Sequence, residues 1–405
     1  MSGTESRLPF VTYVLAAGVF LMGTTEFIVA GILPDIAEDL SVSVSDAGLM
    51  ITVFAIGMIV GTPAMAVLTL RLPRRMTLTL ALLVFAVGPV IVALSSLLPL
   101  ILAARFLTAL ATGAFWAVAA VVGAQAAGPS LSSKALGIVL GGGMLANVVG
   151  VPLGSFAGQT VGWRGPFWAL AVLAVVGALV IFRQVPPDPL DAPAPSLRAE
   201  LRALRDGRVW LVLAGCAVVC GSSLAVYSFI APLLTDNSGL PASAVPLVLV
   251  GYGVGAFIGS NVGGSIGARR PFALRFFSAA ATFLVLVALL LFSHNAVVTV
   301  ILVALLGLFG MSTNPVLIGM AVRYADKAPT LASAMATAAF NFGTAIGSWI
   351  AGMTLATSMG ASGPVAVGAC VAALYVVPLT LLLRRERADL RRPTVESLQR
   401  NKEGR

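Results

Sequence analysis

Residues 8–33 read LPFVTYVLAAGVFLMGTTEFIVAGIL, and Glu26 is the single charged residue in this apolar stretch. About 20 consecutive apolar residues are enough for a helix to cross the hydrocarbon core of a bilayer. A carboxylate at that depth is costly, so it normally faces a bundle interior or a water-filled cavity and binds a proton, a cation or a polar substrate. Glu26 is therefore the first candidate functional residue. The simpler alternative is a hydrogen bond from Glu26 to a neighbouring helix.

The rest of the chain has the same apolar character. Hydrophobic residues make up 59% of the sequence and charged residues only 10%, and the charges gather between apolar stretches. Because unpaired backbone groups are not tolerated in lipid, we expect an all-α membrane protein with twelve transmembrane helices. The first is expected to be a retained span rather than a cleaved signal. The twelve helices are expected to begin near Leu8, Asp46, Arg75, Pro99, Leu131, Arg164, Val209, Ala242, Pro271, Asn295, Thr330 and Ala361.

Basic residues fall on one side of the membrane if these helices alternate in direction. Of the 25 Lys and Arg, only Arg105 and Arg164 lie outside that set. Five acidic residues lie on the opposite side: Asp35, Glu38, Asp39, Asp46 and Asp236. The positive-inside rule makes the basic side cytoplasmic, which predicts a protein of the cytoplasmic membrane with both termini in the cytoplasm. The net charge of +9 then reflects topology and not nucleic-acid binding.

The sequence also contains an internal repeat. Pro34, Gly57 and Gly61 recur as Pro232, Gly255 and Gly259, each pair separated by 198 positions. This spacing predicts two six-helix halves in parallel orientation, 1–185 and 209–392. A proline-rich and basic cytoplasmic linker, 186–208, joins the halves, and a cytoplasmic tail, 393–405, follows them.

Several motifs carry a resemblance to a known family. Residues 25–35, TEFIVAGILPD, resemble the first-span signature of the twelve-span drug:proton antiporters of the major facilitator superfamily, above all its chloramphenicol-efflux proteins. Residues 105–107 with 113–116 resemble the arginine motif of the fourth span. Residues 150–154, GVPLG, with 162–164, resemble the antiporter motif of the fifth span, in which Gly150, Pro152 and Gly154 are the matching positions. The resemblance implies a proton-coupled exporter of lipophilic drugs.

The cytoplasmic loop after the second span departs from the family pattern. There Gly61 is followed by LRLPRR at residues 70–75, so Arg71, Arg74 and Arg75 are present. The aspartate of the usual Asp-Arg-x-Gly-Arg-Arg pattern is missing, and proline replaces its glycine. The contact between halves attributed to that aspartate is therefore in doubt.

Three charged residues are the candidates for proton coupling. With the first helix running outward and the fourth inward, Glu26 and Asp35 lie at a depth similar to that of Arg105, so we expect Arg105 within electrostatic reach of one or both carboxylates. A purely structural role for Arg105 and an interfacial role for Asp35 remain alternatives. Either carboxylate is a candidate carrier of the proton, since the two could titrate as a pair.

Substrate contacts are expected from polar and aromatic residues at mid-depth near the interface of the halves. Packing within the bundle is the alternative for each of them. The candidates are Tyr13, Met22, Trp116, Asn147, Tyr227, Asn261, Asn314 and Asn341. A site lined by aromatic and apolar residues, with few charges, suits a neutral or weakly cationic lipophilic molecule.

Glycines recur every fourth residue in two of the expected helices. One series runs from Gly251 to Gly267, and the other comprises Gly150, Gly154 and Gly158. Such faces allow close helix approach, so we expect either smooth seams on which the halves rock or static packing.

The sequence thus predicts a monomeric proton-coupled exporter, with chloramphenicol or a related phenicol as substrate, and neither an enzyme nor a protein with a metal or cofactor. Export of a sugar or nucleoside metabolite is the alternative, and coupling to sodium in place of protons is not excluded by the sequence. A passive channel is disfavoured because no continuous polar stripe is evident, and a membrane sensor because no soluble signalling domain is present.

Overall fold

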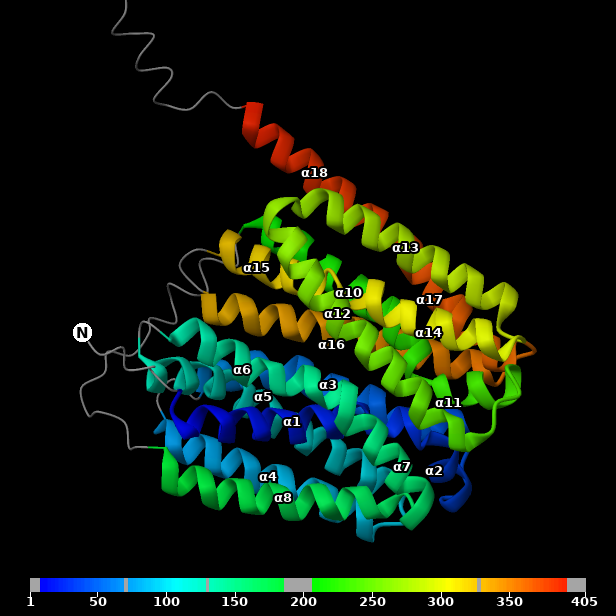
Figure 1. Cartoon of the computed structure of the whole chain (residues 1–405), viewed down its shortest axis with the longest axis horizontal. Helices are drawn as coiled ribbons and strands as arrows, with labels where there is room; N and C mark the ends of the chain where they lie inside the picture. The colour runs from blue at the N-terminus through cyan, green and yellow to red at the C-terminus, as the bar shows by residue number, and fades with distance from the viewer. Residues whose placement is uncertain (1–7, 69–71, 129–130, 186–205, 326–328, 392–405) are drawn as a thin grey trace, which may run out of the picture.

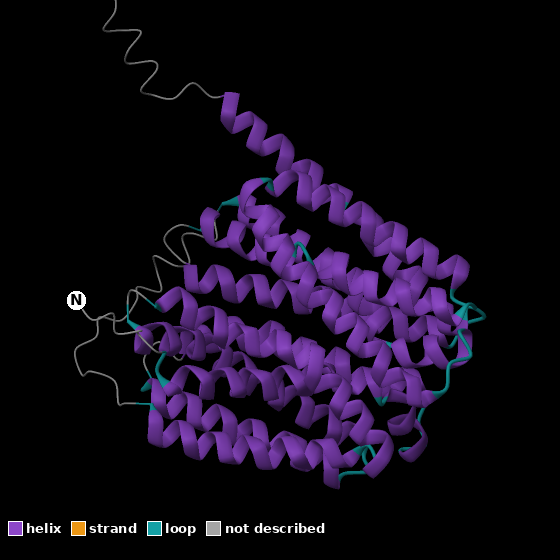
Figure 2. Cartoon of the chain, in the orientation of Figure 1, coloured by secondary structure: helices purple, strands orange, loops and turns teal. Residues whose placement is uncertain are grey.

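The computed structural model describes residues 8–68, 72–128, 131–185, 206–325 and 329–391, and every regular element in these ranges is a helix (Figure 2). Eleven helical segments within them are long and apolar enough to cross a membrane. The remaining expected span, α16 (Pro329–Leu355), has a lower mean hydropathy because it is rich in Ala, Gly, Ser and Thr and poor in Leu and Ile. The predicted twelve-helix all-α membrane fold is confirmed, and each helix begins within three residues of its expected start.

The two predicted halves lie one above the other in Figure 1. The N-half contains α1 (Phe10–Gly31), α2 (Leu33–Asp39), α3 (Val44–Leu68), α4 (Arg74–Leu94), α5 (Leu98–Ala127), α6 (Ser132–Leu145), η2 (Ala146–Gly150), α7 (Val151–Val161) and α8 (Arg164–Gln184). The C-half contains α10 (Gly207–Ser228), α11 (Ile230–Pro232), η3 (Leu233–Asn237), η4 (Ala242–Ala244), α12 (Val245–Arg269), α13 (Pro271–Phe292), α14 (Ala296–Met311), α15 (Asn314–Tyr324), α16, η5 (Gly360–Ser362), α17 (Gly363–Leu374) and α18 (Val376–Arg391). Most of the expected linker and the expected tail lie outside the described residues.

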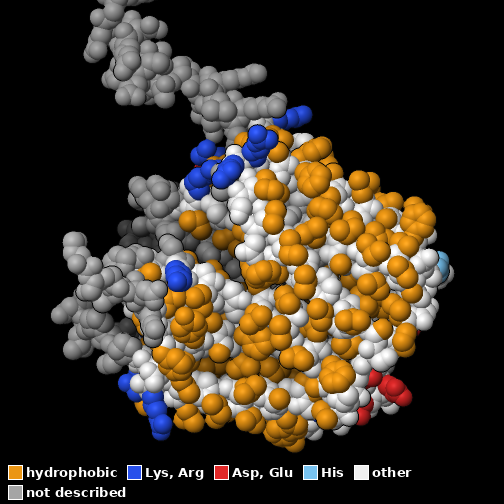
Figure 3. All heavy atoms as spheres, viewed as in Figure 1, with side chains coloured by type: hydrophobic (Ala, Val, Ile, Leu, Met, Phe, Trp, Pro, Cys, Tyr) orange, Lys and Arg blue, Asp and Glu red, His pale blue; other side chains and the backbone are white. Residues whose placement is uncertain are grey.

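Charge separates the two ends of the bundle. Figure 3 shows basic side chains gathered at one end and acidic side chains at the other, with an apolar surface between them. The end that carries Arg74, Arg75 and Lys134 is called the basic end below. The end that carries Asp35 and Asp46 is called the acidic end.

The internal repeat appears as equivalent helix packing. A Cβ added at Gly61 of α3 would lie 2.9 Å from the Cα of Leu110 in α5, and one added at Gly259 of α12 would overlap the carbonyl oxygen of Leu308 in α14. Leu110 and Leu308 are themselves separated by 198 positions. Equivalent helix pairs, α3 with α5 and α12 with α14, therefore pack closely at a glycine in each half.

Both glycine series pack helices within a half. A Cβ at Gly263 would overlap the carbonyl oxygen of Ser312, and the series of α12 thus faces α14 and the turn after it. A Cβ at Gly154 would overlap the side chain of Ile28 in α1, which also belongs to the N-half. Of the two alternatives, these faces fit static packing within a half and not a seam between the halves, because spacing defines a close-packing face without defining which helix occupies it.

Contacts between the halves run along two other seams. In the first, here the close seam, η2 and α7 pack on α12: a Cβ at Gly253 would overlap the carbonyl oxygen of Asn147 and lie 2.7 Å from the Cα of Val148. In the second, here the polar seam, α3 packs on α16, and the hydroxyls of Thr52 and Ser348 are hydrogen-bonded at 2.8 Å. The equivalence of these helix pairs follows from the repeat.

The halves share an apolar core only at the acidic end. One cluster of buried apolar residues joins the two halves and includes Ile28 and Ile36 from one and Ala225 and Leu249 from the other. Two further clusters, which lie toward the basic end, are each confined to one half. The halves are thus sealed against each other at the acidic end and packed separately at the basic end.

Candidate functional site

Arg105 of α5 is buried and holds three helices together. Its guanidinium donates to the carbonyl oxygens of Thr25 at 2.8 Å, Glu26 at 3.3 Å and Met50 at 3.3 Å, and it lies over the ring of Phe54 at 4.4 Å. These acceptors belong to α1 and α3. Because a buried guanidinium needs its donors satisfied, the three carbonyls fix Arg105 beside the backbone of Glu26.

The carboxyl group of Glu26 has neither a hydrogen bond nor an ion pair among the described residues, although Arg105 lies within electrostatic range. It faces a pocket of about 10 Å³, hardly room for one water molecule. Both halves line this pocket: Phe27, Ala30 and Ile51 from the N-half, and Leu224, Tyr227, Ser228 and Thr344 from the C-half. Glu26 therefore lies where the two halves meet, beside the shared apolar core.

Asp35 lies apart from this pocket. It belongs to the first turn of α2 at the acidic end, and its side chain is exposed. Desolvation against the protein surface, and then the neighbouring Glu38 carboxylate, raises the pKa of Asp35 above its usual value. Of the two predicted carboxylates, the structure brings only Glu26 to Arg105.

Polar side chains of the C-half surround Cys220 of α10. The amide nitrogen of Asn314 lies 3.8 Å from its sulfur, and the rings of Tyr227 and Tyr252 stack at 4.4 Å between centroids. Both phenol hydroxyls and the amide oxygen of Asn314 are buried without a hydrogen-bond partner in the described part of the chain. Since buried polar atoms are almost always paired, this cluster has unmet capacity for a polar group of a ligand. Cys220 is in electrostatic range of Glu26, which places the cluster beside the pocket.

The structure places two of the predicted substrate contacts at or beside the Glu26 pocket and the others elsewhere. Tyr227 lines the Glu26 pocket and Asn314 belongs to the cluster beside it. Met22 is fully buried in the apolar core of the N-half, which fits the packing alternative. Tyr13 is half exposed and precedes Glu26 on α1 by about 20 Å of helix. Trp116 is half-buried, and its indole nitrogen has no partner among the described residues.

The remaining three asparagines donate to their own helices. Asn147 donates to Gly143 at 3.4 Å, Asn261 to Phe257 at 2.8 Å and Asn341 to Thr337 at 3.1 Å. Asn147 also lies in the wide turn of η2, whose backbone meets Gly253 across the close seam. Its clearest contribution is therefore to the contact between the halves.

The family motifs have structural roles near the site. Gly150 and Gly154 let α7 approach Thr24 and Ile28 of α1, and Pro152 lies in the first turn of α7.

In the loop motif, Arg74 donates to Gln125, and Arg75 lies over the ring of Phe182 at 3.9 Å. Both contacts stay within the N-half. Arg71 lies outside the described residues.

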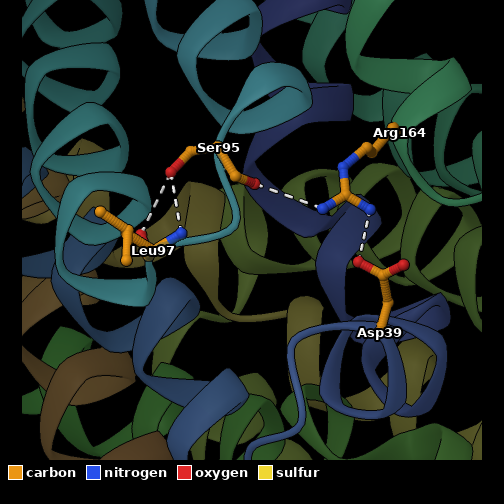
Figure 4. Close-up of polar contacts among 4 residues, drawn as sticks. All are labelled: Asp39, Ser95, Leu97 and Arg164. Atoms are coloured by element: carbon orange, nitrogen blue, oxygen red, sulfur yellow. Dashed lines mark hydrogen bonds and ion pairs between the residues drawn. The ribbon is translucent and has the colours of Figure 1, made fainter.

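Arg164 closes the acidic end of the N-half (Figure 4). It pairs with Asp39 of α2 and donates to the carbonyl oxygen of Ser95 at 3.3 Å, while its guanidinium lies over Trp163 at 4.2 Å. One side chain thus ties α2, the turn before α5 and α8 together. All of these contacts of Arg164 lie within the N-half.

Sequence reasoning missed a polar stripe on α16. Its members recur every three or four residues and face one side of the helix: Ser333, Thr337, Asn341, Thr344 and Ser348. Thr344 lines the Glu26 pocket and Ser348 bonds across the polar seam. The expectation that the chain has no continuous polar stripe is therefore wrong, and the helical period of the hydroxyls was the available signal.

These features define a class of protein, a multi-pass membrane transporter with two pseudo-symmetric halves. The family model described as Major Facilitator Superfamily matches residues 15–336, with a second match over 214–403. The chain belongs to the major facilitator superfamily and is a membrane transporter, not an enzyme.

Relatives of known name agree with this assignment. The chain is 38% identical over 377 residues to a chloramphenicol resistance protein of Streptomyces lividans, covering 91% of this chain and 95% of that one. It is 30% identical to the inner membrane transport protein YdhP of Escherichia coli K12, over 94% and 97% of the two chains. A crystal structure of a bacterial homologue of the human lysosomal transporter Spinster matches the fold with a TM-score of 0.75 at 15% identity, covering 96% and 98%.

Proposed function

We propose that this transporter exports a small lipophilic drug, chloramphenicol or a related phenicol, across the cytoplasmic membrane in exchange for protons. The basic end is taken as cytoplasmic, since it carries the excess of Lys and Arg. The observation that carries the proposal is the unpaired carboxyl group of Glu26, placed where residues of both halves meet. The similarity to a chloramphenicol resistance protein supports the choice of drug.

The proposed cycle follows from the cost of burying charge. A neutral Glu26 fits a pocket with almost no water, whereas an ionised carboxylate there favours an arrangement in which water reaches it. A proton from the acidic side therefore favours the arrangement described here, sealed at the acidic end. Binding of a drug from the basic side is then coupled to release of the proton to the cytoplasm. The ionised Glu26 favours reopening at the acidic end, where the drug leaves.

The C-half supplies the other side of the proposed drug site. The hydroxyls of Tyr227 and Tyr252 and the amide oxygen of Asn314 offer both donors and an acceptor without present partners. Aromatic rings beside them suit an apolar aromatic body with polar groups. Arg105 is assigned a positioning role, because its guanidinium holds backbone carbonyls. Asp35, exposed at the acidic end, is assigned a secondary role.

Accumulation of labelled chloramphenicol in a sensitive host tests the proposal. The intact chain is expected to lower accumulation, and a protonophore is expected to abolish the effect. Glu26→Gln keeps the shape of the side chain but cannot ionise, so it should abolish export as well. Glu38→Gln makes the same chemical change at an exposed site of α2 and should leave export intact, as should replacement of sodium.

Two results contradict the proposal. Unchanged accumulation with a well-expressed intact chain removes the phenicol assignment and favours the metabolite-export alternative. Export that survives in Glu26→Gln but is lost in Asp35→Asn transfers the coupling proton to the exposed carboxylate.

A further inference from the structure

The polar seam contains a hollow at its acidic end. Its volume is about 180 Å³, and its polar lining comes from both halves: Ser45, Asp46 and Thr52 of α3 and Ser348 of α16. The side chain of Asp46 is exposed at the rim. A polar cavity of this size holds several water molecules, because one water needs only about 10–15 Å³ measured in the same way.

A pair of hydroxyls forms the inner limit of the hollow. Thr52 and Ser348 line it, are buried, and share a hydrogen bond of 2.8 Å across the seam. Nearer the rim, Ser45 donates to the carbonyl oxygen of Gly352 at 2.7 Å. These are exchangeable polar contacts, which water can replace as the halves move apart.

The Glu26 pocket begins directly behind this pair. Thr344 lies one helical turn from Ser348 on the same face of α16, an axial step of about 6 Å, and it lines the pocket. On the opposite wall, Ile51 is the chain neighbour of Thr52 and lines the same pocket. One layer of side chains therefore separates a polar hollow at the acidic end from the half-buried carboxyl group of Glu26.

The close seam is packed more tightly than the polar seam. There the backbone of Asn147 and Val148 meets Gly253 directly, with no space for a side chain. Ser155 is buried, donates to the carbonyl oxygen of Gly31 at 2.9 Å, and packs beside Leu249. Close packing on this side of the seal leaves fewer polar groups for water to bind than the polar seam does.

We infer that the polar seam is the proton entry route from the acidic side to Glu26, with Thr52 and Ser348 as its closed gate in this structure. The inference rests on the proposed function. Water fills the hollow, passes the hydroxyl pair when the halves begin to separate, and reaches Glu26 along Thr344. A hydronium ion then gives its proton to the carboxylate, leaving water and a neutral carboxyl group. The other ionisable groups that face Glu26 are Arg105 of α5 and Cys220 and Tyr227 of α10.

Proton flux in liposomes containing the full chain tests the route. Thr344→Val and the double variant Thr52→Val/Ser348→Ala remove hydroxyls and keep side-chain volume nearly constant. Chloramphenicol-dependent proton movement, followed with a pH-sensitive dye, is expected to fall about tenfold, since a passage without polar partners does not hold water. Exchange of labelled for unlabelled drug at equal pH needs no net proton transfer and should stay within about twofold.

Thr112→Val is the matched control. Thr112 is buried in α5 and donates to its own helix at 2.9 Å, as Thr344 does at 3.0 Å, but it lies away from the polar seam. If the seam variants keep the full proton flux of the intact chain, the route is wrong. If the intact chain itself moves no protons with the drug, the proposed function fails instead.

Thiol labelling tests the route without reference to coupling. In a chain carrying Cys370→Ser, the other two native cysteines are buried. A small membrane-impermeant thiosulfonate added at the acidic side should modify Ser348→Cys. Ser155→Cys, the matched change beside the close seam, should react at least tenfold more slowly, because opening of a packed seam is rare. Equal rates at the two positions would overturn the inference.

Discussion

The two seams between the halves are related by the internal repeat but are built from different contacts. In the close seam, the carbonyl oxygen of Asn147 lies against Gly253, so backbone meets backbone. In the polar seam, Thr52 and Ser348 meet through hydroxyls beside a hollow of about 180 Å³. A repeat therefore fixes which helices meet without fixing the chemistry of the contact. From this difference we expect the close seam to stay closed and the polar seam to admit water.

The largest effect on stability and export is expected when Gly253→Ala adds a methyl group in the close seam. The new Cβ in Gly253→Ala would overlap the carbonyl oxygen of Asn147, and backbone cannot move aside as a side chain can. Overpacking of this kind typically lowers stability by about 1–3 kcal/mol. We expect a lower thermal midpoint and a loss of chloramphenicol export.

Gly251→Ala is the control for that change. Its Cβ would lie at an ordinary distance of 3.7 Å from the Cβ of Ala304, within the C-half. Stability should be unchanged or slightly raised, because alanine favours helix by about 1 kcal/mol over glycine. Equal thermal midpoints for the two variants would contradict the description of the close seam.

A smaller effect is expected from the same substitution in the polar seam. In Gly352→Ala the Cβ would lie 3.1 Å from the ring of Phe229 and 3.2 Å from the hydroxyl of Ser45, both of them side-chain atoms that can shift. The gain in helix propensity offsets the crowding, so stability should change by less than about 1 kcal/mol. Filling the hollow should nevertheless slow proton movement relative to drug exchange. A destabilisation as large as that of Gly253→Ala would remove the contrast between the seams.

The fold was largely predictable because its physics is local. Apolar length locates each helix, and glycine spacing locates each close-packing face, as at Gly61 and Gly259. Neither signal identifies the neighbouring helix. For that reason the series ending at Gly267 was compatible with a seam between the halves or with static packing, and it is found packed within the C-half.

The candidate site was predictable only in part. Glu26 could be found because a single carboxylate in an apolar run is rare. The helical period of Thr344 and Ser348 indicated a polar face of α16, but it did not indicate that α3 packs against that face. The unmet hydrogen bonds of Tyr252 likewise depend on long-range packing, and no local pattern reports them.

The smallest effect is expected from the ion pair at the acidic end of the N-half. Asp39→Asn removes the charge that faces Arg164, but the guanidinium keeps its bond to the carbonyl oxygen of Ser95 and its contact with Trp163. Exposed ion pairs contribute only about 0.2–1 kcal/mol, and salt screens them. The thermal midpoint should therefore fall slightly at low ionic strength and match the intact chain at high ionic strength.

Measuring transport by Asp39→Asn tests whether surface charge or the two seams close the acidic end between the halves. The ion pair of Asp39 with Arg164 and the bond of Arg164 to Ser95 lie within the N-half, so the seal between the halves should not depend on them. Export of chloramphenicol is expected to equal that of the intact chain. If export instead fell below that of Gly352→Ala, the acidic end would be closed by its ion pair, and the comparison of the two seams would lose its force.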